Sequence, residues 1–263
     1  MTARFDAYLF DLDGTIYLGD RLLPGAAETI AWLRAEGVPF RFLSNNATRS
    51  PGQYAEKLTA LGIPTVPADV VNTVTVTTHW LRTNHPEAVV FPIAERPLIE
   101  AFEAAGIAMS EDPAEIDIVV ASYDRGFDYR KLQIAFDAIW FHKRAFLIAT
   151  NPDRYCPFPG GRGEPDCAAV VAAIEASTST TCRAVLGKPD PAMAAAALAG
   201  IDVDPTRCVM VGDRLGTDIE LAHRSGLQSA LVLTGDSSRA DVEAAAPDAR
   251  PGLVLERLDE LIA

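Results

Sequence analysis

The chain is poor in the residues that build disulfide frameworks and zinc sites. Its 263 residues include 4 cysteines and 4 histidines, with no Cys-x-x-Cys pair and no two histidines four residues apart. These spacings fit neither a disulfide-stapled secreted domain nor a tetrahedral zinc site. We therefore expect the cysteines to be reduced thiols and the protein to be cytoplasmic.

Long apolar segments and positive charge are also scarce. No segment approaches the roughly 20 apolar residues that span a bilayer, and the first residues lack the apolar stretch of a signal peptide. Lys and Arg total 23 against 36 Asp and Glu, which gives a net charge of -13. Clustered basic residues hold nucleic acids and anionic membranes, so neither is an expected partner. A small anionic substrate is compatible, because it senses the local field and any bound cation.

What the chain does have is a pair of carboxylates at the end of an apolar run. Residues 7–10 predict a short buried strand, and Asp11 and Asp13 follow it, with a Gly-Thr turn next. Strand ends of open α/β sheets face the edge where ligands bind. Two acids there repel each other unless a cation or a proton-transfer role accounts for them. A simple solvated turn would explain one Asp, but it explains the pair poorly.

Strands and helices alternate along the chain, which is typical of a parallel sheet with crossover helices. We predict a Rossmann-like, doubly wound α/β core formed by residues 1–77 and 180–263, with a second α/β unit inserted at 78–179. Within that unit, the segment 153–166 is rich in Pro and Gly and is predicted to be a structured loop. The last helix is predicted at 257–262.

Three more strand ends carry polar side chains, namely Ser44 with Asn45, Lys188, and Asp213 with Asp218. Converging carboxylates form a hard-cation site that suits Mg²⁺, and a lysine beside them balances phosphoryl charge. An Asp can attack phosphorus, while a second Asp two residues on protonates the leaving oxygen and then activates water. Neither a G-x-x-x-x-G-K-[ST] nucleotide loop nor a Ser-His-Asp elbow is present.

Together these residues resemble the four motifs of the haloacid dehalogenase-superfamily phosphatases, which are read here as Asp11-Leu12-Asp13-Gly14-Thr15, Ser44-Asn45-Asn46, Lys188-Pro189 and Gly212-Asp213-x4-Asp218. The run Ala149-Thr150-Asn151-Pro152-Asp153 resembles the class IIA branch of NagD and p-nitrophenylphosphatase. That branch has a large α/β cap between the second and third motifs. The resemblance covers essentially the whole chain.

The resemblance implies a role for each matched residue: Asp11 as nucleophile and Mg²⁺ ligand, Asp13 as general acid/base and carbonyl ligand, Ser44 and Asn45 as phosphate ligands, Lys188 as the phosphoryl counter-charge, Asp213 as Mg²⁺ ligand and Asp218 as an orienting group behind the ligands. In the cap it implies four candidate substrate contacts, Asn151, Asp153, Arg154 and Tyr155. Members of the branch commonly dimerise, which implies a homodimer through the cap.

The expected activity is Mg²⁺-dependent hydrolysis of a small phosphomonoester through an aspartyl-phosphate, with a cytosolic sugar, glycerol or nucleoside phosphate as substrate. The cap loop departs from the small, Gly-rich form of the branch at 155–158 and 165–167, so the particular ester stays open. A dehalogenase, a phosphomutase and a non-enzymatic phosphoacceptor switch are the alternatives. Asp13 argues against the dehalogenase, the large cap argues against the switch, and a phosphomutase is expected to carry a smaller helical cap.

Overall fold

The structure is a computed structural model that describes residues 4–158 and 162–262. These residues form two compact units. Unit 1 comprises residues of 1–44, 51–71 and 188–263, and unit 2 comprises 45–50 and 72–187. The polypeptide therefore passes between the units four times, directly after Ser44, Ser50, Val71 and Gly187. The assignment of a catalytic core and a specificity cap, with boundaries at 78 and 179, stays a prediction.

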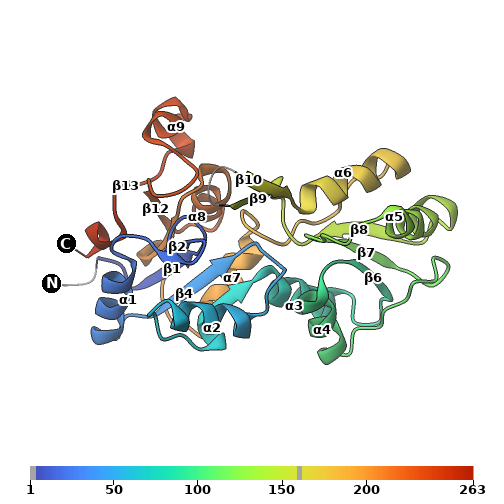
Figure 1. The fold of residues 1–263 in the computed structure, drawn as a ribbon, viewed down its shortest axis with the longest axis horizontal. Helices are drawn as coiled ribbons and strands as arrows, with labels where there is room; N and C mark the ends of the chain where they lie inside the picture. The colour runs from blue at the N-terminus through green and yellow to red at the C-terminus, as the bar shows by residue number, and fades with distance from the viewer. Residues whose placement is uncertain (1–3, 159–161, 263) are drawn as a thin grey trace. The chain divides into compact units, whose positions relative to one another are not determined.

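Unit 1 is built on a six-stranded parallel sheet with the order β13-β12-β11-β1-β4-β5, which confirms the predicted α/β class (Figure 1). Its strands are β1 (Ala7–Asp11), β4 (Phe40–Ser44), β5 (Val70–Asn72), β11 (Cys208–Gly212), β12 (Gln228–Val232) and β13 (Leu253–Leu255). Strand β1 lies in the interior of the sheet, where Phe10 is opposite Val211 of β11 and Phe42 of β4. The central strand thus carries the first motif.

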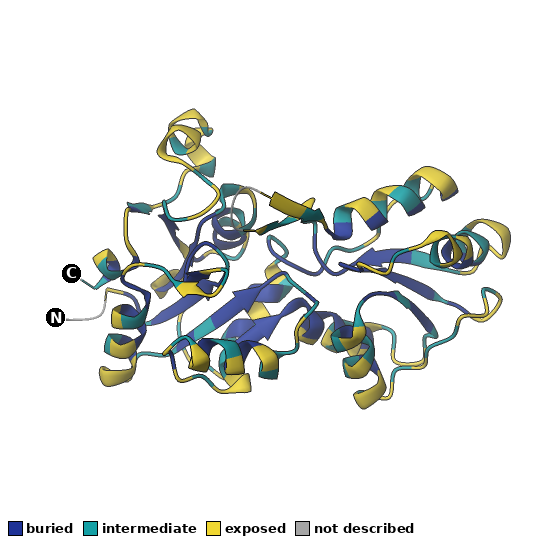
Figure 2. Cartoon of the chain, in the orientation of Figure 1, coloured by how far each residue is buried: buried dark blue, intermediate teal, exposed yellow. Residues whose placement is uncertain are grey.

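One apolar cluster packs helices against this sheet. Helices α1 (Ala26–Ala35) and α2 (Pro51–Ala60) contribute Ile30 and Tyr54 to a cluster that contains Tyr8 and Phe10 of β1. Helices α7 (Pro191–Leu198) and α8 (Glu220–Arg224) contact β4 and β11 respectively. Figure 2 shows the inner strands of the sheet, such as β1 and β11, as buried and the outward faces of α1 and α2 as exposed. Burial on one face and exposure on the other is what an amphipathic surface helix requires.

One short element of unit 1 differs from the sequence-based expectation. The predicted helix at 257–262 is a 3₁₀ turn, η6 (Leu258–Leu261). Leu258 and Leu261 are its buried residues, and a single turn with three residues per repeat is enough to bury both. The remaining short elements are the hairpin strands β2 (Tyr17–Leu18) and β3 (Arg21–Leu22), helix α9 (Arg239–Ala244), the 3₁₀ turns η1 (Pro67–Asp69), η3 (Pro205–Arg207) and η5 (Pro247–Ala249), and the π-turn η4 (Leu215–Ile219).

Unit 2 contains its own parallel sheet of three strands in the order β6-β7-β8, namely β6 (Val90–Ile93), β7 (Ile118–Ala121) and β8 (Phe146–Ala149). Its helices are α3 (Thr73–Asn84), α4 (Arg96–Ala104), α5 (Tyr129–Phe136), which continues into the π-turn η2 (Asp137–Phe141), and α6 (Cys167–Thr178). Ile134 of α5 and Ile174 of α6 join a buried cluster with residues of all three strands. Among the described residues, no helix is both long and apolar enough to cross a bilayer.

The predicted loop at 153–166 is in fact a β-hairpin. Strand β9 (Tyr155–Phe158) pairs antiparallel with β10 (Arg162–Pro165), and Cys156 is opposite Glu164. Pro157 and Pro165 favoured the prediction of a loop, because proline is disfavoured in central strands. A two-stranded ribbon tolerates proline, since every strand in it is an edge. Residues 159–161, between the two strands in the sequence, lie outside the described residues.

Candidate active site

Asp11 and Lys188 form a buried pair in unit 1. Asp11 is the last residue of the central strand β1 and is 8% exposed, while Lys188 is 3% exposed. The Lys188 ammonium donates one hydrogen bond to Asp11 Oδ1 and a second, of 2.7 Å, to Asp218 Oδ1. Burial works against the charge on Lys188, yet the two carboxylates raise its pKa above the ordinary value. The lysine therefore stays charged at neutral pH.

Asp213 is held in a narrow space directly after β11. Its Oδ2 accepts the main-chain N–H of Asp236 at 2.7 Å. A Cβ added at Gly235 would lie 2.0 Å from this oxygen, and one added at Gly14, whose φ is +92°, would lie 2.3 Å from it. Both distances are far below van der Waals contact, so both positions need glycine. Gly14 belongs to the first motif, whereas sequence reasoning did not single out Gly235.

Asp218 is oriented by two donors. Its Oδ1 accepts from Lys188, and its Oδ2 accepts the main-chain N–H of Arg214 at 3.0 Å. Gly212 makes room for it, because a Cβ there would lie 2.2 Å from the Asp218 Cγ. Because both of its oxygens accept hydrogen bonds, the main effect of Asp218 is to hold the Lys188 ammonium in position.

The cluster fits a divalent cation. One carboxylate oxygen from each of Asp11, Asp213 and Asp218 lies within 4.8 Å of the others. Three carboxylates and one ammonium carry two excess negative charges, and Asp213 Oδ1 is buried with no hydrogen-bond partner among the described residues. A divalent cation that prefers oxygen ligands would coordinate Asp213 Oδ1 and would neutralise the two excess negative charges. Without it, burial raises the pKa of Asp213 to about 7 and that of Asp11 well above its usual range.

Asp13 lies beside an aromatic hydroxyl that sequence reasoning missed. The Tyr17 hydroxyl donates a hydrogen bond of 3.3 Å to Asp13 Oδ2. The Tyr17 ring is fully buried, and the Lys57 ammonium sits 3.6 Å from its centre. The tight turn at Gly14 brings positions 13 and 17 together. That turn signal was available in the sequence, although the side-chain contact was not.

Ser44 is the last residue of β4, and Asn45 is the first residue after it, where the chain passes from unit 1 to unit 2. The Ser44 hydroxyl, which belongs to unit 1, shares a hydrogen bond of 3.1 Å with the hydroxyl of Tyr54 on α2. The main-chain carbonyl of Asn45, which belongs to unit 2, accepts two hydrogen bonds, from Thr73 Oγ1 at 2.8 Å and from Asn151 Nδ2 at 3.0 Å. Tyr54 and Thr73 have no motif around them, and nothing in the sequence marked either one.

The four predicted substrate contacts of unit 2 have different environments. Asn151 is 0% exposed, and its Oδ1 accepts the N–H of Asp153 at 2.9 Å, so main-chain partners engage both ends of its amide. Asp153 is half-buried. Arg154 and Tyr155 are exposed. Of the four, only Arg154 and Tyr155 are exposed, and Tyr155 is 46% exposed.

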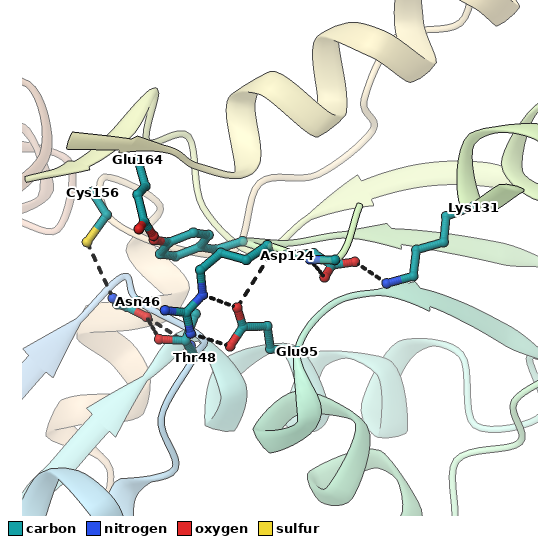
Figure 3. Close-up of polar contacts among 10 residues, drawn as sticks. Asn46, Thr48, Glu95, Asp124, Lys131, Cys156 and Glu164 are labelled. Atoms are coloured by element: carbon teal, nitrogen blue, oxygen red, sulfur yellow. Dashed lines mark hydrogen bonds and ion pairs between the residues drawn. The ribbon is translucent and has the colours of Figure 1, made fainter. Parts of the chain in front are cut away.

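Unit 2 also holds a polar network that the sequence did not reveal (Figure 3). The Tyr123 hydroxyl donates to Glu164 of β10, and Asn46 Nδ2 donates to Cys156 Sγ of β9 at 3.7 Å. Burial, together with the Glu164 carboxylate, raises the pKa of Tyr123, which keeps it a neutral donor. These two hydrogen bonds connect the hairpin to the segment that follows β7 and to the segment that follows Ser44.

Comparisons with known proteins agree with this arrangement. A family model described as haloacid dehalogenase-like hydrolase matches residues 8–108, and one described as HAD-hydrolase-like matches residues 185–261. The sugar-phosphatase AraL of Bacillus subtilis is 35% identical over 240 residues, which cover 91% of this chain and 87% of that protein.

Two solved structures share the fold along nearly the whole chain. The 4-nitrophenylphosphatase of Thermotoga maritima has a TM-score of 0.91 at 34% identity, covering 98% of this chain and 96% of its own. NagD of Escherichia coli K-12 has a TM-score of 0.86 at 27% identity, covering 99% and 98%. The chain therefore belongs to the haloacid dehalogenase-like hydrolases, in the class IIA branch of NagD and the p-nitrophenylphosphatases, and is a phosphatase of that family.

Proposed function

We propose that this phosphatase hydrolyses small sugar phosphates, with Mg²⁺ as cofactor and an aspartyl-phosphate as intermediate. The buried cluster of Asp11, Lys188, Asp213 and Asp218 carries the proposal, because it combines a nucleophilic carboxylate, a fixed cation and a fitting metal site. The name of AraL, a sugar-phosphatase 35% identical to this chain, supports the substrate class.

In the first half-reaction, a carboxylate oxygen of Asp11 attacks the phosphorus atom. A bond forms between that oxygen and phosphorus while the bond from phosphorus to the sugar oxygen breaks. Asp13 transfers its proton to the departing oxygen, so that the sugar leaves as a neutral alcohol. The ammonium of Lys188 balances the charge of the phosphoryl oxygens, and the polar groups of Ser44 and Asn45 donate hydrogen bonds to them.

In the second half-reaction, Asp13, now a carboxylate, takes a proton from water. The oxygen of that water attacks phosphorus, and the bond to the Asp11 oxygen breaks. Inorganic phosphate leaves, and both carboxyl groups return to their starting states. The Tyr17 hydroxyl supports this role, since its hydrogen bond to Oδ2 helps to orient the Asp13 carboxyl group.

Asp11, Asp213 and the main-chain carbonyl of Asp13 would hold the Mg²⁺ ion, with Asp218 orienting the group. The ion supplies Lewis-acid polarisation of the phosphoryl oxygens and lowers the cost of bringing two anions together. The excess charge of the cluster and the orphaned Oδ1 of Asp213 support this assignment.

Substrate choice is proposed to lie in unit 2. Arg154 and Tyr155 are the exposed members of the predicted set, and Asp153 is half-buried beside them. An arginine and an aromatic ring together suit a sugar, because the guanidinium donates to hydroxyl groups and the ring packs on apolar C–H faces. Asn151 is fully buried, and both ends of its amide already have main-chain partners. The cytoplasmic location and the homodimer through this unit remain predictions.

The test is phosphate release from p-nitrophenyl phosphate and from a panel of sugar, glycerol and nucleoside phosphates, with Mg²⁺ or EDTA. We expect Mg²⁺-dependent turnover that is fastest on sugar phosphates, and loss of turnover in a folded Asp11→Asn variant. Absence of release across the panel would refute the proposed reaction. Turnover that is retained in Asp11→Asn would refute the role of Asp11 as nucleophile. Equal rates in Mg²⁺ and in EDTA would refute the requirement for Mg²⁺.

A further inference from the structure

The carbonyl of Asn45 is the meeting point of three separate chain segments in unit 2. Thr73, the first residue of α3, donates to it at 2.8 Å, and Asn151, which follows β8, donates at 3.0 Å. Thr73 and Asn151 are both 0% exposed, and Asn45 is 7% exposed. Main-chain carbonyls have two lone pairs, so the two donors saturate this acceptor in a dry environment.

The amide of Asn151 can be oriented in only one way. Its Oδ1 accepts the N–H of Asp153 at 2.9 Å, so its Nδ2 must face Asn45. Thr150 beside it is also fully buried, and its hydroxyl donates to the Ser122 hydroxyl at 3.0 Å. The donor is therefore held by buried hydrogen bonds of its own amide and of the neighbouring Thr150.

These contacts occur at the places where the chain passes between the units. Asn45 directly follows Ser44, and Thr73 lies two residues beyond Val71. Gly187, the last residue of unit 2 before Lys188, approaches the same point. A Cβ on Gly187 would lie 2.7 Å from Asn45 Oδ1 and 2.8 Å from the Thr150 carbonyl. Ser44 directly precedes the first junction and Lys188 directly follows the last one, and both are, with Asn45, proposed to contact the phosphoryl group.

We propose that Thr73 and Asn151 are positioning residues for the phosphoryl group: by fixing the Asn45 carbonyl, they fix the backbone that presents Ser44 and Asn45. This inference rests on the proposed function, since it assumes that Ser44 and Asn45 bind phosphate. A misplaced peptide at Asn45 moves both ligands at once, whereas the leaving alcohol is not involved. The loss of either donor should therefore lower kcat/KM by the same factor for every phosphate ester.

The experiment compares Thr73→Val with the wild-type enzyme. Valine keeps the shape of threonine but lacks the hydroxyl. We expect kcat/KM to fall by about 3- to 10-fold for a sugar phosphate and by the same factor for p-nitrophenyl phosphate, the size of one buried hydrogen bond. The dissociation constant of inorganic phosphate, measured by calorimetry with Mg²⁺ present, should rise by that factor too.

Two further variants separate positioning from general damage to the fold. Thr73→Ser keeps the hydroxyl and should restore most of the lost activity. Thr77→Val lies one turn along the same helix, where the Thr77 hydroxyl is fully buried but has no hydrogen-bond partner among the described residues. It should leave both kcat/KM values and phosphate affinity unchanged, and all variants should be compared at temperatures well below their melting points.

Each outcome decides a point. A loss confined to one of the two esters would mean that Thr73 acts on the alcohol, and an unchanged Thr73→Val or an equal loss in Thr77→Val would overturn the inference. A wild-type enzyme without turnover would refute the proposed function. In that case the dissociation constants of inorganic phosphate, measured for the same variants, would still decide whether Thr73 positions an anion-binding site.

Discussion

The Lys188 ammonium donates a hydrogen bond of 2.7 Å to Asp218, thirty residues further along the chain, and both side chains are buried. The same ammonium also donates to Asp11 at the end of the central strand. One lysine thus joins the carboxylate at the end of β1 to a carboxylate in η4, and Asp218 helps to fix the position of the ammonium. Lys188 itself follows an isolated bridge at Val185 and not a strand, so the predicted strand end at this position is wrong. A buried ammonium with a single carboxylate would be free to rotate toward other acceptors.

We predict that Asp218→Asn lowers kcat by about 10- to 100-fold, the range expected when a buried charged hydrogen bond loses its ionic partner. The amide is nearly the same size, so the fold should persist, as circular dichroism can check. Asp202→Asn changes an exposed aspartate of the same unit and serves as the control. Wild-type kcat in Asp218→Asn would show that Lys188 needs no second anchor.

Gly235→Ala should weaken metal binding. The new Cβ would lie 2.0 Å from Asp213 Oδ2 and would push that carboxylate away. Disturbing the support of a metal ligand typically costs about 10- to 100-fold in affinity or activity, so the Mg²⁺ concentration for half-maximal activity should rise by that factor.

Gly216→Ala is the matched control for this variant, because no atom lies within 4 Å of its added Cβ. It should behave like wild type in the same titration of Mg²⁺. Equal Mg²⁺ requirements for both glycine variants would contradict the proposed role of Asp213.

Stability without metal should fall as the pH rises. In the folded protein the pKa of Asp213 is raised to about 7 from its ordinary 3.8, chiefly by burial and then by Asp218. Between these values the folded state keeps a proton that the unfolded state has released. Folding is therefore favoured at low pH, and this contribution is lost as the pH rises from about 4 to about 7.

Mg²⁺ should reverse the effect, because it compensates the ionised carboxylates. In thermal melts with EDTA or Mg²⁺, we expect the rise in melting temperature on adding Mg²⁺ to be larger at pH 7.5 than at pH 5.5. A rise of the same size at both values would argue against coupling between the cation and these carboxylates.

Tyr17→Phe should lower kcat by about 2- to 10-fold and leave the KM nearly unchanged. The variant removes one hydrogen bond of 3.3 Å to Asp13 and keeps the buried ring. Asp13 acts on the leaving oxygen and on water, so its orientation affects turnover more than binding. Tyr8→Phe, in the core of the same unit, provides the comparison. An effect on KM alone would place Tyr17 in binding instead.

Much of the framework follows from local sequence. The apolar run before Asp11 predicts β1 because a strand buried on both faces needs no polar alternation. Pro51 and Pro191 start helices, and Gly200 follows the helix that Pro191 begins, because each suits the backbone of a helix end. These signals are short-range, so alternation and the α/β class could be read without coordinates.

The hairpin at 155–165 and the 3₁₀ turn at 258–261 could not be read in this way, since proline spacing and two buried leucines are compatible with several local structures. The contacts of the site are harder still. Asn151 and Asn45 are separated by 106 residues, and their hydrogen bond exists only because folded segments bring a donor and a carbonyl together in a dry interior.

The sequence alone determined which chemical groups stand at the strand ends, and hence the family and the kind of reaction. The tertiary structure decided what holds those groups: Lys188 between two carboxylates, Asp213 between two glycines, and the Asn45 carbonyl under Thr73 and Asn151. The physical reason is that a motif records residue types along a strand. The position of a buried polar group depends on partners that other parts of the chain supply.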